Sequence, residues 1–530
     1  MSDPNDNPER ASEETAQAGT IEVSGDQEAP LVSDADIAAL EETLAAFAQN
    51  PSQVLNRPIQ KFDGDGNPVS PYTPFAQADI ASRRFIQASD EYRKEHSMEH
   101  DGVIVSLAEV MPGRAPYAGN DRAENLVDEL KYTKLSSMHA ARLRAATLPV
   151  QPWSDDYWGL FQGTLGCRYG DESYPKDLDW GVNHRYVQQR SAADIFAAGD
   201  AAAIDKLSPS EKYDLLVGDR SGTLTERMWE MGRYYYERDG KVEPWMGICH
   251  GWSPAAYMLA RPRRAVDVVA PDGTTKIRFY PADIKALASL LWAQVAPNSR
   301  FIGGRFNEPD PEQDSNGRII AQSAFDTNPG TLHLSVVNQI GVSQRSFVID
   351  ATYDYEVWNQ PVSEYKYSYF NPLTRKFSAS LTRAQVAYDD FKSEDKFKKY
   401  RSDDVRSIVG VYMQLSYMVE VHPRQRDVDG PGHDAFNTAK YMYDLELDEA
   451  GRIIGGEWYQ NAHPDFLWTP PPNARAVTVA DRAARGDWSS PSEPVPSTWQ
   501  AAAPQAARGR KGAPLAAVVE RLIAFANRED

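Results

Sequence analysis

The stretch PWMGICHGWSPAA, residues 244–256, places a cysteine between glycines and tryptophans just ahead of a helix-start pattern. Ser253 followed by Pro254 favours a helix start, because serine caps free backbone N–H groups and proline needs no donor in the first turn. Cys249 therefore lies about one turn before a helix, or at its first residue if the helix begins early and kinks at Pro254. In both cases the sulfur faces the positive end of a helix dipole, which favours thiolate over thiol.

The neighbours of Cys249 leave two interpretations open. Gly247 and Gly251 allow another backbone to approach closely, as a catalytic site requires. A lone cysteine in a globular chain is also commonly a small buried hydrophobic residue, and Cys167, the other cysteine, is interpreted in that way.

A base and its orienting partner are predicted from residues 331–351, TLHLSVVNQIGVSQRSFVIDA, which read as two β-prone segments around Gly341-Val342. A Gly-X pair suits a two-residue hairpin turn, and counting outward from this turn places His333 opposite Asp350. Facing residues lie on one side of a sheet with Cβ atoms about 5 Å apart, close enough for a carboxylate to orient an imidazole. A register shift of one residue puts the two on opposite faces.

Cys249, His333 and Asp350 thus form a candidate Cys-His-Asp triad. Such a triad catalyses acyl transfer, in which a thiolate attacks a carbonyl and the imidazolium protonates the leaving amine. The enzyme is a peptidase or deamidase if water then takes the acyl group, and a transferase if an amine takes it. The spacing of the residues does not decide between them.

Several sequence blocks, in order along the chain, resemble the transglutaminase elicitor family, known from plant-pathogenic oomycetes and also found in bacteria. The resemblance spans about residues 150–470. Besides residues 244–256, the blocks are PWSDDYWGLFQG (152–163), LSPSEKYDLLVGD (207–219), YPADIKAL (280–287), SFVIDATYDYEVWNQPV (346–362) and YDLELDEAGRIIGGEWYQNAHPDFLW (443–468).

This resemblance implies an α+β fold with a papain-like core, in which a helix-borne Cys249 packs on an antiparallel sheet carrying His333 and Asp350. It implies a transglutaminase that joins a protein glutamine to a primary amine such as lysine, with Cys249 forming the thioester. His333 would be the general base and acid, and Asp350 would orient it. Trp245 and Trp252 are candidate donors to the oxyanion or the substrate, with packing as the alternative for Trp245.

The segment VWNQPV, residues 357–362, belongs in that family to a surface peptide that plants perceive. The perceived peptide continues with a basic residue and a glycine, whereas Ser363-Glu364 follow here, so immune recognition is not inherited. An alternative of another class is a non-catalytic effector or recognition protein that acts through a surface patch at residues 357–367.

Composition suggests one large α+β unit with extensions. Mixed helix and strand patterns, with no repeats, fill the centre of the chain, and residues 37–47 carry a helical apolar stripe. The predicted organisation is an acidic, mostly disordered arm (1–59) with a helix near 36–49, a catalytic domain (60–475), a Pro/Ala/Ser linker (476–513) and an amphipathic helix (514–530).

The net charge of -20 disfavours binding to nucleic acid and to anionic membranes, and no apolar run is long enough to span a membrane. The first 50 residues hold twelve acidic residues against Arg10, which contributes -11 of this charge. No secretory signal is found and two cysteines cannot form a disulfide framework. The expected location is the cytoplasm, or outside the cell by a route independent of such a signal.

Two patterns hint at metals. His96-Ser-Met-Glu-His100 matches a zinc-peptidase motif, and Asp427, Asp429 and Asp434 form an acidic turn that could bind calcium. The triad itself requires no cofactor, and calcium dependence stays open.

Overall fold

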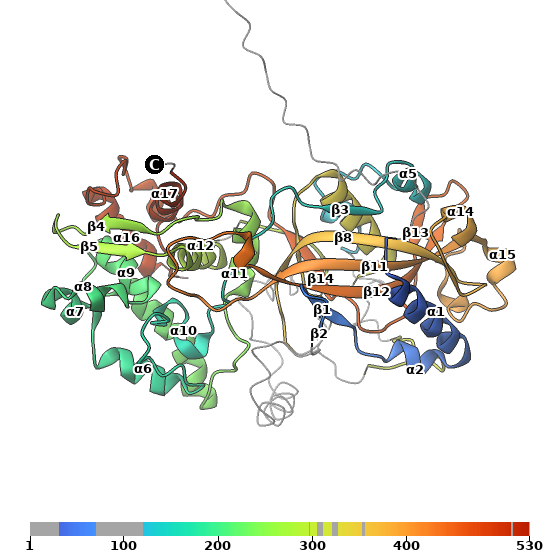
Figure 1. The fold of residues 1–530 in the computed structure, drawn as a ribbon, viewed down its shortest axis with the longest axis horizontal. Helices are drawn as coiled ribbons and strands as arrows, with labels where there is room; N and C mark the ends of the chain where they lie inside the picture. Colours follow the sequence, from blue (N-terminus) through green and yellow to red (C-terminus); the bar gives the residue numbers. More distant parts are fainter. Residues whose placement is uncertain are drawn as a thin grey trace, which may run out of the picture.

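The computed structural model describes residues 31–69, 120–295, 297–304, 311–320, 327–351, 356–509 and 512–528. They form helices and an antiparallel sheet arranged as two lobes, one mainly helical and one built on a large sheet (Figure 1). The predicted mixture of helix and antiparallel sheet is confirmed. Most of the acidic arm and the motif His96–His100 lie outside the described residues.

The large sheet is antiparallel throughout, with a central order β2-β1-β12-β11-β8-β7-β14-β6. Tyrosines at alternate positions of β8 (Tyr365, Tyr367, Tyr369) face the core of this lobe, as the two-residue period of a strand requires. The strand bounds are β1 Lys61–Asp63, β2 Pro68–Val69, β3 Ala145–Thr147, β6 Arg300–Gly303, β7 Val348–Ile349, β8 Gln360–Asn371, β9 Lys376–Ser378, β10 Val386–Ala387, β11 Ser407–Val419, β12 Ala435–Leu447, β13 Ile453–Gly455 and β14 Phe466–Thr469.

The helical lobe has its own apolar core and a two-stranded sheet, β4 (Val266–Val269) with β5 (Lys276–Phe279). Its helices are α6 Trp180–Gln188, α7 Ala192–Ala198, α8 Ala201–Asp205, α9 Pro209–Leu216, α10 Thr223–Asp239, α11 Cys249–Met258, α12 Pro281–Val295, α16 Ser497–Arg508 and α17 Ala516–Ala526. The sheet lobe carries α1 Asp34–Gln49, α2 Pro51–Leu55, α5 Leu135–Ala140, α13 Pro329–Val336, α14 Leu381–Ala384 and α15 Tyr388–Phe391.

The helix predicted near residues 36–49 is confirmed as α1. Ser33 caps it in a reciprocal pair of hydrogen bonds with Asp36, and its apolar stripe is buried at Leu40, Leu44 and Phe47. Asp36 also pairs with Lys440 of β12 at 2.6 Å, so α1 docks on the large sheet.

The predicted hairpin in residues 331–351 is wrong. Asn328 caps a helix that starts at Pro329, and α13 continues as a wider helical turn over Val337–Val342. Nearly every side chain of this segment is buried, so its continuous apolar run resembles a buried strand and hides the helical period. The Asn-Pro pair at 328–329 was the helix-start signal.

The predicted linker at residues 476–513 is also wrong, because this segment packs into the helical lobe. Trp488 and Trp499 are buried there, as are four alanines of α16. Small alanine side chains let helices approach closely, so a composition that suggests a linker here forms packed structure. The C-terminal helix is confirmed as α17, whose apolar face is buried and whose preceding residue, Leu515, donates its N–H to the Tyr213 hydroxyl at 2.8 Å.

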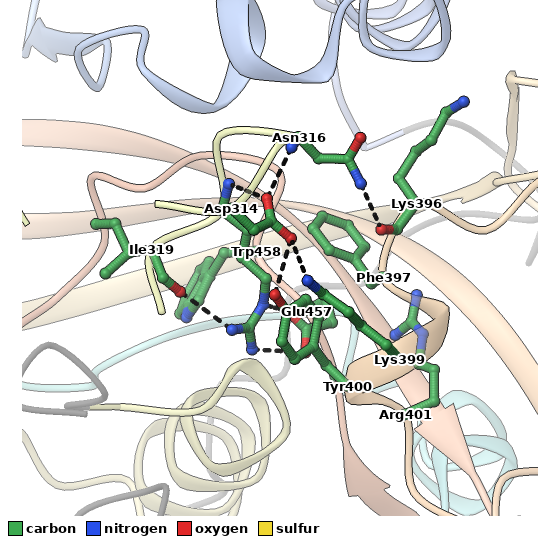
Figure 2. Close-up of polar contacts among 12 residues, drawn as sticks. Asp314, Asn316, Ile319, Lys396, Phe397, Lys399, Tyr400, Arg401, Glu457 and Trp458 are labelled. Carbon is green, nitrogen blue, oxygen red and sulfur yellow. Dashed lines mark hydrogen bonds and ion pairs between the residues drawn. The ribbon is translucent and has the colours of Figure 1, made fainter. Parts of the chain in front are cut away.

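A network of ion pairs joins two loops of the sheet lobe to the residues around β12 and β13 (Figure 2). Arg318 donates two hydrogen bonds to Glu457, of 2.7 and 2.9 Å, and its guanidinium lies 3.8 Å from the centre of the Tyr400 ring. Lys399 pairs with Asp314 at 3.3 Å at the edge of the same network.

Arg401 lies at the buried end of this network, with 1% of its side chain exposed. Its guanidinium contacts three buried carboxylates, those of Asp395 (3.0 Å), Asp444 (2.5 Å) and Glu446 (3.4 Å). Asp444 and Glu446 lie on β12, so Arg401 holds its loop against the central sheet.

Candidate active site

Helix α11 begins at Cys249, so the second of the two predicted helix starts is confirmed. Pro254 lies inside the helix, and the residue before Cys249, Ile248, provides no side-chain cap. The prediction that Ser253 is the N-cap is wrong. Its hydroxyl instead bonds to the carbonyl of Cys249 at 2.9 Å and to the carbonyl of Asn359, which ties α11 to the start of β8.

The glycines that flank Cys249 do allow close backbone approach. A Cβ atom at Gly251 would lie 2.2 Å from the Ser289 carbonyl of α12, and one at Gly247 would lie 2.3 Å from the Tyr157 carbonyl. The start of α11 is therefore held between α12 and the segment around Tyr157.

The thiol of Cys249 is buried, with the residue 5% exposed. It lies 3.9 Å from the carbonyl oxygen of Val357, to which it donates, and accepts a hydrogen bond from Asn359 Nδ2 at 3.6 Å. Burial raises the pKa of the thiol to about 12, Asn359 lowers it, and the charges of Glu420 and Asp350 raise it. The expectation of a thiolate is not met in this arrangement, because burial outweighs the favourable helix terminus.

Asp350 is close enough to Cys249 for its charge to raise the pKa of the thiol, although not through the predicted hairpin. Strand β7 pairs with β8 through Val348–Pro361 and Ile349–Gln360, and the next pair in this register is Asp350 with Asn359. Facing residues share a face, and Asn359 touches the sulfur on that face. The effect of the Asp350 charge on the pKa of Cys249 agrees with this placement.

The structure does not bring His333 to Cys249 or to Asp350. Its Nδ1 lies 2.8 Å from the Tyr443 hydroxyl, its ring meets the Tyr367 ring edge-on at 4.7 Å, and its Nε2 is buried without a hydrogen-bond partner among the described residues. Burial lowers the pKa of His333 to about 3, which makes the ring neutral.

His333 and Asp350 do not meet because they lie on opposite faces of the large sheet. Ile349 and the α13 residue Leu332 share the core of the sheet lobe, whereas Val348 packs in a separate cluster with Trp468 and Val357. Asp350 shares a face with Val348 because side chains alternate along a strand. The predicted pairing of His333 with Asp350 is therefore wrong, and the two lie on opposite faces.

The two candidate tryptophans have other partners. Trp252 is fully buried and donates its indole N–H to the Trp153 carbonyl at 2.9 Å, which is a packing role. The indole N–H of Trp245 donates to Glu243 at 2.6 Å. Neither N–H points to the sulfur of Cys249 in this structure.

The segment VWNQPV is not a surface patch. All six residues from Val357 to Val362 are buried, because β8 is an inner strand between β7 and β11. Lys366 is the exposed residue in the patch predicted at 357–367. The hypothesis of a recognition surface at this segment is therefore wrong for this structure, and part of the segment covers the thiol instead.

Sequence reasoning missed Glu420, which follows β11. The register that pairs Tyr417 with Val362 brings Glu420, three residues on, to the level of Asn359. Glu420 is 8% exposed, its Oε2 accepts a hydrogen bond from Gln360 at 3.2 Å, and its Oε1 has no partner among the described residues. Burial raises its pKa to about 8. Nothing in the local sequence indicates that this carboxylate is buried near Cys249.

We expect Glu420 to make stability fall with rising pH. Its pKa in the folded state lies well above the ordinary value of 4.5, so the stabilisation from its bound proton is complete below about pH 4.5 and is lost as the pH rises toward 8. Glu420→Gln removes this dependence. As the pH rises from 5 to 8, the free energy of unfolding of the variant should therefore increase relative to that of the wild type by about a few kcal/mol. Urea unfolding at several pH values measures the difference, and parallel pH profiles would contradict it.

The acidic turn that hinted at calcium is occupied by a cation of the chain itself. Arg261 pairs with Asp429 at 3.0 Å and also with Asp434. Within the described ranges, no group of three or more His, Cys, Asp or Glu residues is arranged to hold a metal ion. No helix in those ranges is long and apolar enough to cross a membrane.

Comparison with known proteins adds a family. A family model described as transglutaminase elicitor matches residues 127–484, and no curated protein matches the chain. Among solved structures, the chain is similar to the GP42 transglutaminase from Phytophthora sojae, with 22% identity and a TM-score of 0.43 over 63% of this chain and 86% of that one. The family match includes Cys249, Asp350 and Glu420 and ends before α16.

Proposed function

Because the chain belongs to the transglutaminase elicitor family, we propose that it transfers the acyl group of a protein glutamine to a primary amine through Cys249. The observation that carries this proposal is the placement of Cys249 as the first residue of α11 with the Asp350 carboxylate beside it. A cysteine at a helix start is one of the settings in which a sulfur nucleophile serves thioester chemistry.

The reaction proceeds in two balanced steps. The Cys249 sulfur bonds to the carbonyl carbon of the glutamine side chain, the C–N bond breaks, and ammonia leaves with the thiol hydrogen. A primary amine then bonds to the same carbon, the C–S bond breaks, and the hydrogen from the amine restores the thiol. In this proposal the Asp350 carboxylate accepts or orients the proton on its way from the sulfur to the leaving ammonia.

The resting thiol has to be uncovered before it reacts. The residue is almost fully buried, and its sulfur lies against the Val357 carbonyl. A thiol with a pKa of about 12 is almost entirely protonated at neutral pH, so its proton is removed as the acyl group binds.

The experiment that tests this proposal is amine incorporation by the full chain. We expect a fluorescent primary amine to become linked to a glutamine-bearing protein, with the product mass equal to the sum of both less ammonia. The assay is run with and without calcium. Conversion of glutamine to glutamate that added amine does not suppress would assign the chain as a deamidase, and the absence of both products would reject acyl transfer from glutamine.

A further inference from the structure

Asn359 is the residue that meets the sulfur of Cys249 with hydrogen-bond donors. Its side-chain Nδ2 lies 3.6 Å from Sγ, and its backbone N–H also acts to lower the pKa of the thiol. The residue is almost fully buried, so water does not compete for these donors. We propose that Asn359 is a catalytic residue that stabilises the thiolate of Cys249, and that Trp468 holds the Asn359 amide in the orientation this requires.

The orientation of the amide follows from its second contact. Asn359 Oδ1 accepts a hydrogen bond from the indole N–H of Trp468 at 2.9 Å. An indole nitrogen can only donate, so the oxygen of the amide faces Trp468 and the NH₂ group is left to face the sulfur. The Asn359 carbonyl is also held, by the hydroxyl of Ser253 on α11.

The need for such donors follows from the charges around the sulfur. The charges of Asp350 and Glu420 both disfavour the negatively charged thiolate of Cys249, and burial disfavours it as well. The described contacts that act in the opposite direction are those of the Asn359 side chain and backbone, which lower the pKa of the thiol. Hydrogen bonds to an ionised group are stronger than those to a neutral one, so these donors favour ionisation, in which the proton passes to solvent.

The proposal rests on Cys249 being the nucleophile of the proposed transferase, and its test measures the thiol directly. In Asn359→Asp the side-chain volume and the oxygen that faces Trp468 are kept, while the donor to the sulfur is replaced by a carboxylate oxygen. We expect iodoacetamide to alkylate Cys249 roughly 10- to 100-fold more slowly in this variant, because a hydrogen bond to the thiolate is lost and the new carboxylate repels the charge on the sulfur. Peptide mass analysis separates Cys249 from Cys167, which serves as the reference thiol in the same sample.

A second variant and two controls separate this role from a structural one. Trp468→Phe keeps an aromatic ring but removes the indole N–H, so we expect a smaller fall in alkylation of Cys249. Trp488→Phe removes an indole hydrogen bond of 2.8 Å to Glu493 in the helical lobe, and should leave it unchanged. Asn183→Ala removes a buried amide with hydrogen bonds of 2.7 and 3.0 Å, and should lower thermal stability without changing the reactivity of Cys249 relative to Cys167.

An unchanged or faster alkylation of Cys249 in Asn359→Asp would overturn the proposal. If that variant does not fold, an unchanged rate in Trp468→Phe overturns it instead. If the wild type incorporates no amine but Asn359→Asp still slows the alkylation of Cys249, the role of Asn359 is supported and the transferase is rejected. Normal amine incorporation by Asn359→Asp with unchanged alkylation would do the reverse.

Discussion

Cys249→Ala is expected to abolish amine incorporation, with a loss of at least about 10³-fold, because alanine cannot form the thioester. The substitution removes one buried atom, so we expect the free energy of unfolding to fall by only about 1 kcal/mol. Initial rates with a fluorescent amine, alongside a thermal melt of each protein, measure both quantities.

Cys167→Ala is the matched control for this prediction. Cys167 is as buried as Cys249, and it likewise makes a long thiol contact, of 3.4 Å to Gln162 Oε1. It belongs to the core of the helical lobe and touches neither β7 nor β8 in the described contacts, so its loss should leave the rate intact. Undiminished labelling by Cys249→Ala would exclude Cys249 as the nucleophile.

Arg401→Leu is expected to destabilise the sheet lobe by about 3–5 kcal/mol, a large part of the stability of an ordinary domain. Leucine fills part of the space but leaves Asp395, Asp444 and Glu446 buried without their cation. Burial already raises the pKa of Asp444 and of Glu446, while Arg401 lowers both. Urea denaturation of the variant and of the wild type gives the difference.

The destabilisation should depend on pH with a defined sign. Without Arg401, the pKa values of Asp444 and Glu446 rise further, so the folded variant takes up protons as pH falls and the deficit shrinks. The loss is therefore expected to be larger at pH 8 than at pH 5. Arg375→Leu is the matched control, because Arg375 is half exposed and lies 3.9 Å from Glu394, so its loss should cost less than about 1 kcal/mol.

The start of α11 could be predicted from the sequence because its signals are local. The proline at 254 favours a helix start near Cys249, and one of the two predicted starts is the observed one. The helix at 36–49 was predictable for the same reason, since Ser33 and Asp36 cap it through neighbours in the chain.

The neighbourhood of Cys249 was harder to predict because distant segments build it. Asp350 reaches Cys249 through the pairing of β7 with β8, and Glu420 reaches it from the end of β11. The error at His333 has a local cause, since an almost fully buried helix shows no polar face and its apolar run suggests strands. Asn359 lies in the stretch 346–362 that resembles the family, but its burial could not be predicted because it depends on which strands flank β8.

The packing of α17 has a consequence for the order in which the chain folds during synthesis. Leu515, Val518, Val519 and Leu522 complete the apolar core that α11 and α12 also line. The ribosome adds these residues 266 to 273 positions after Cys249. The core behind Cys249 therefore stays incomplete while the whole sheet lobe emerges, so we expect the helical lobe to finish folding last.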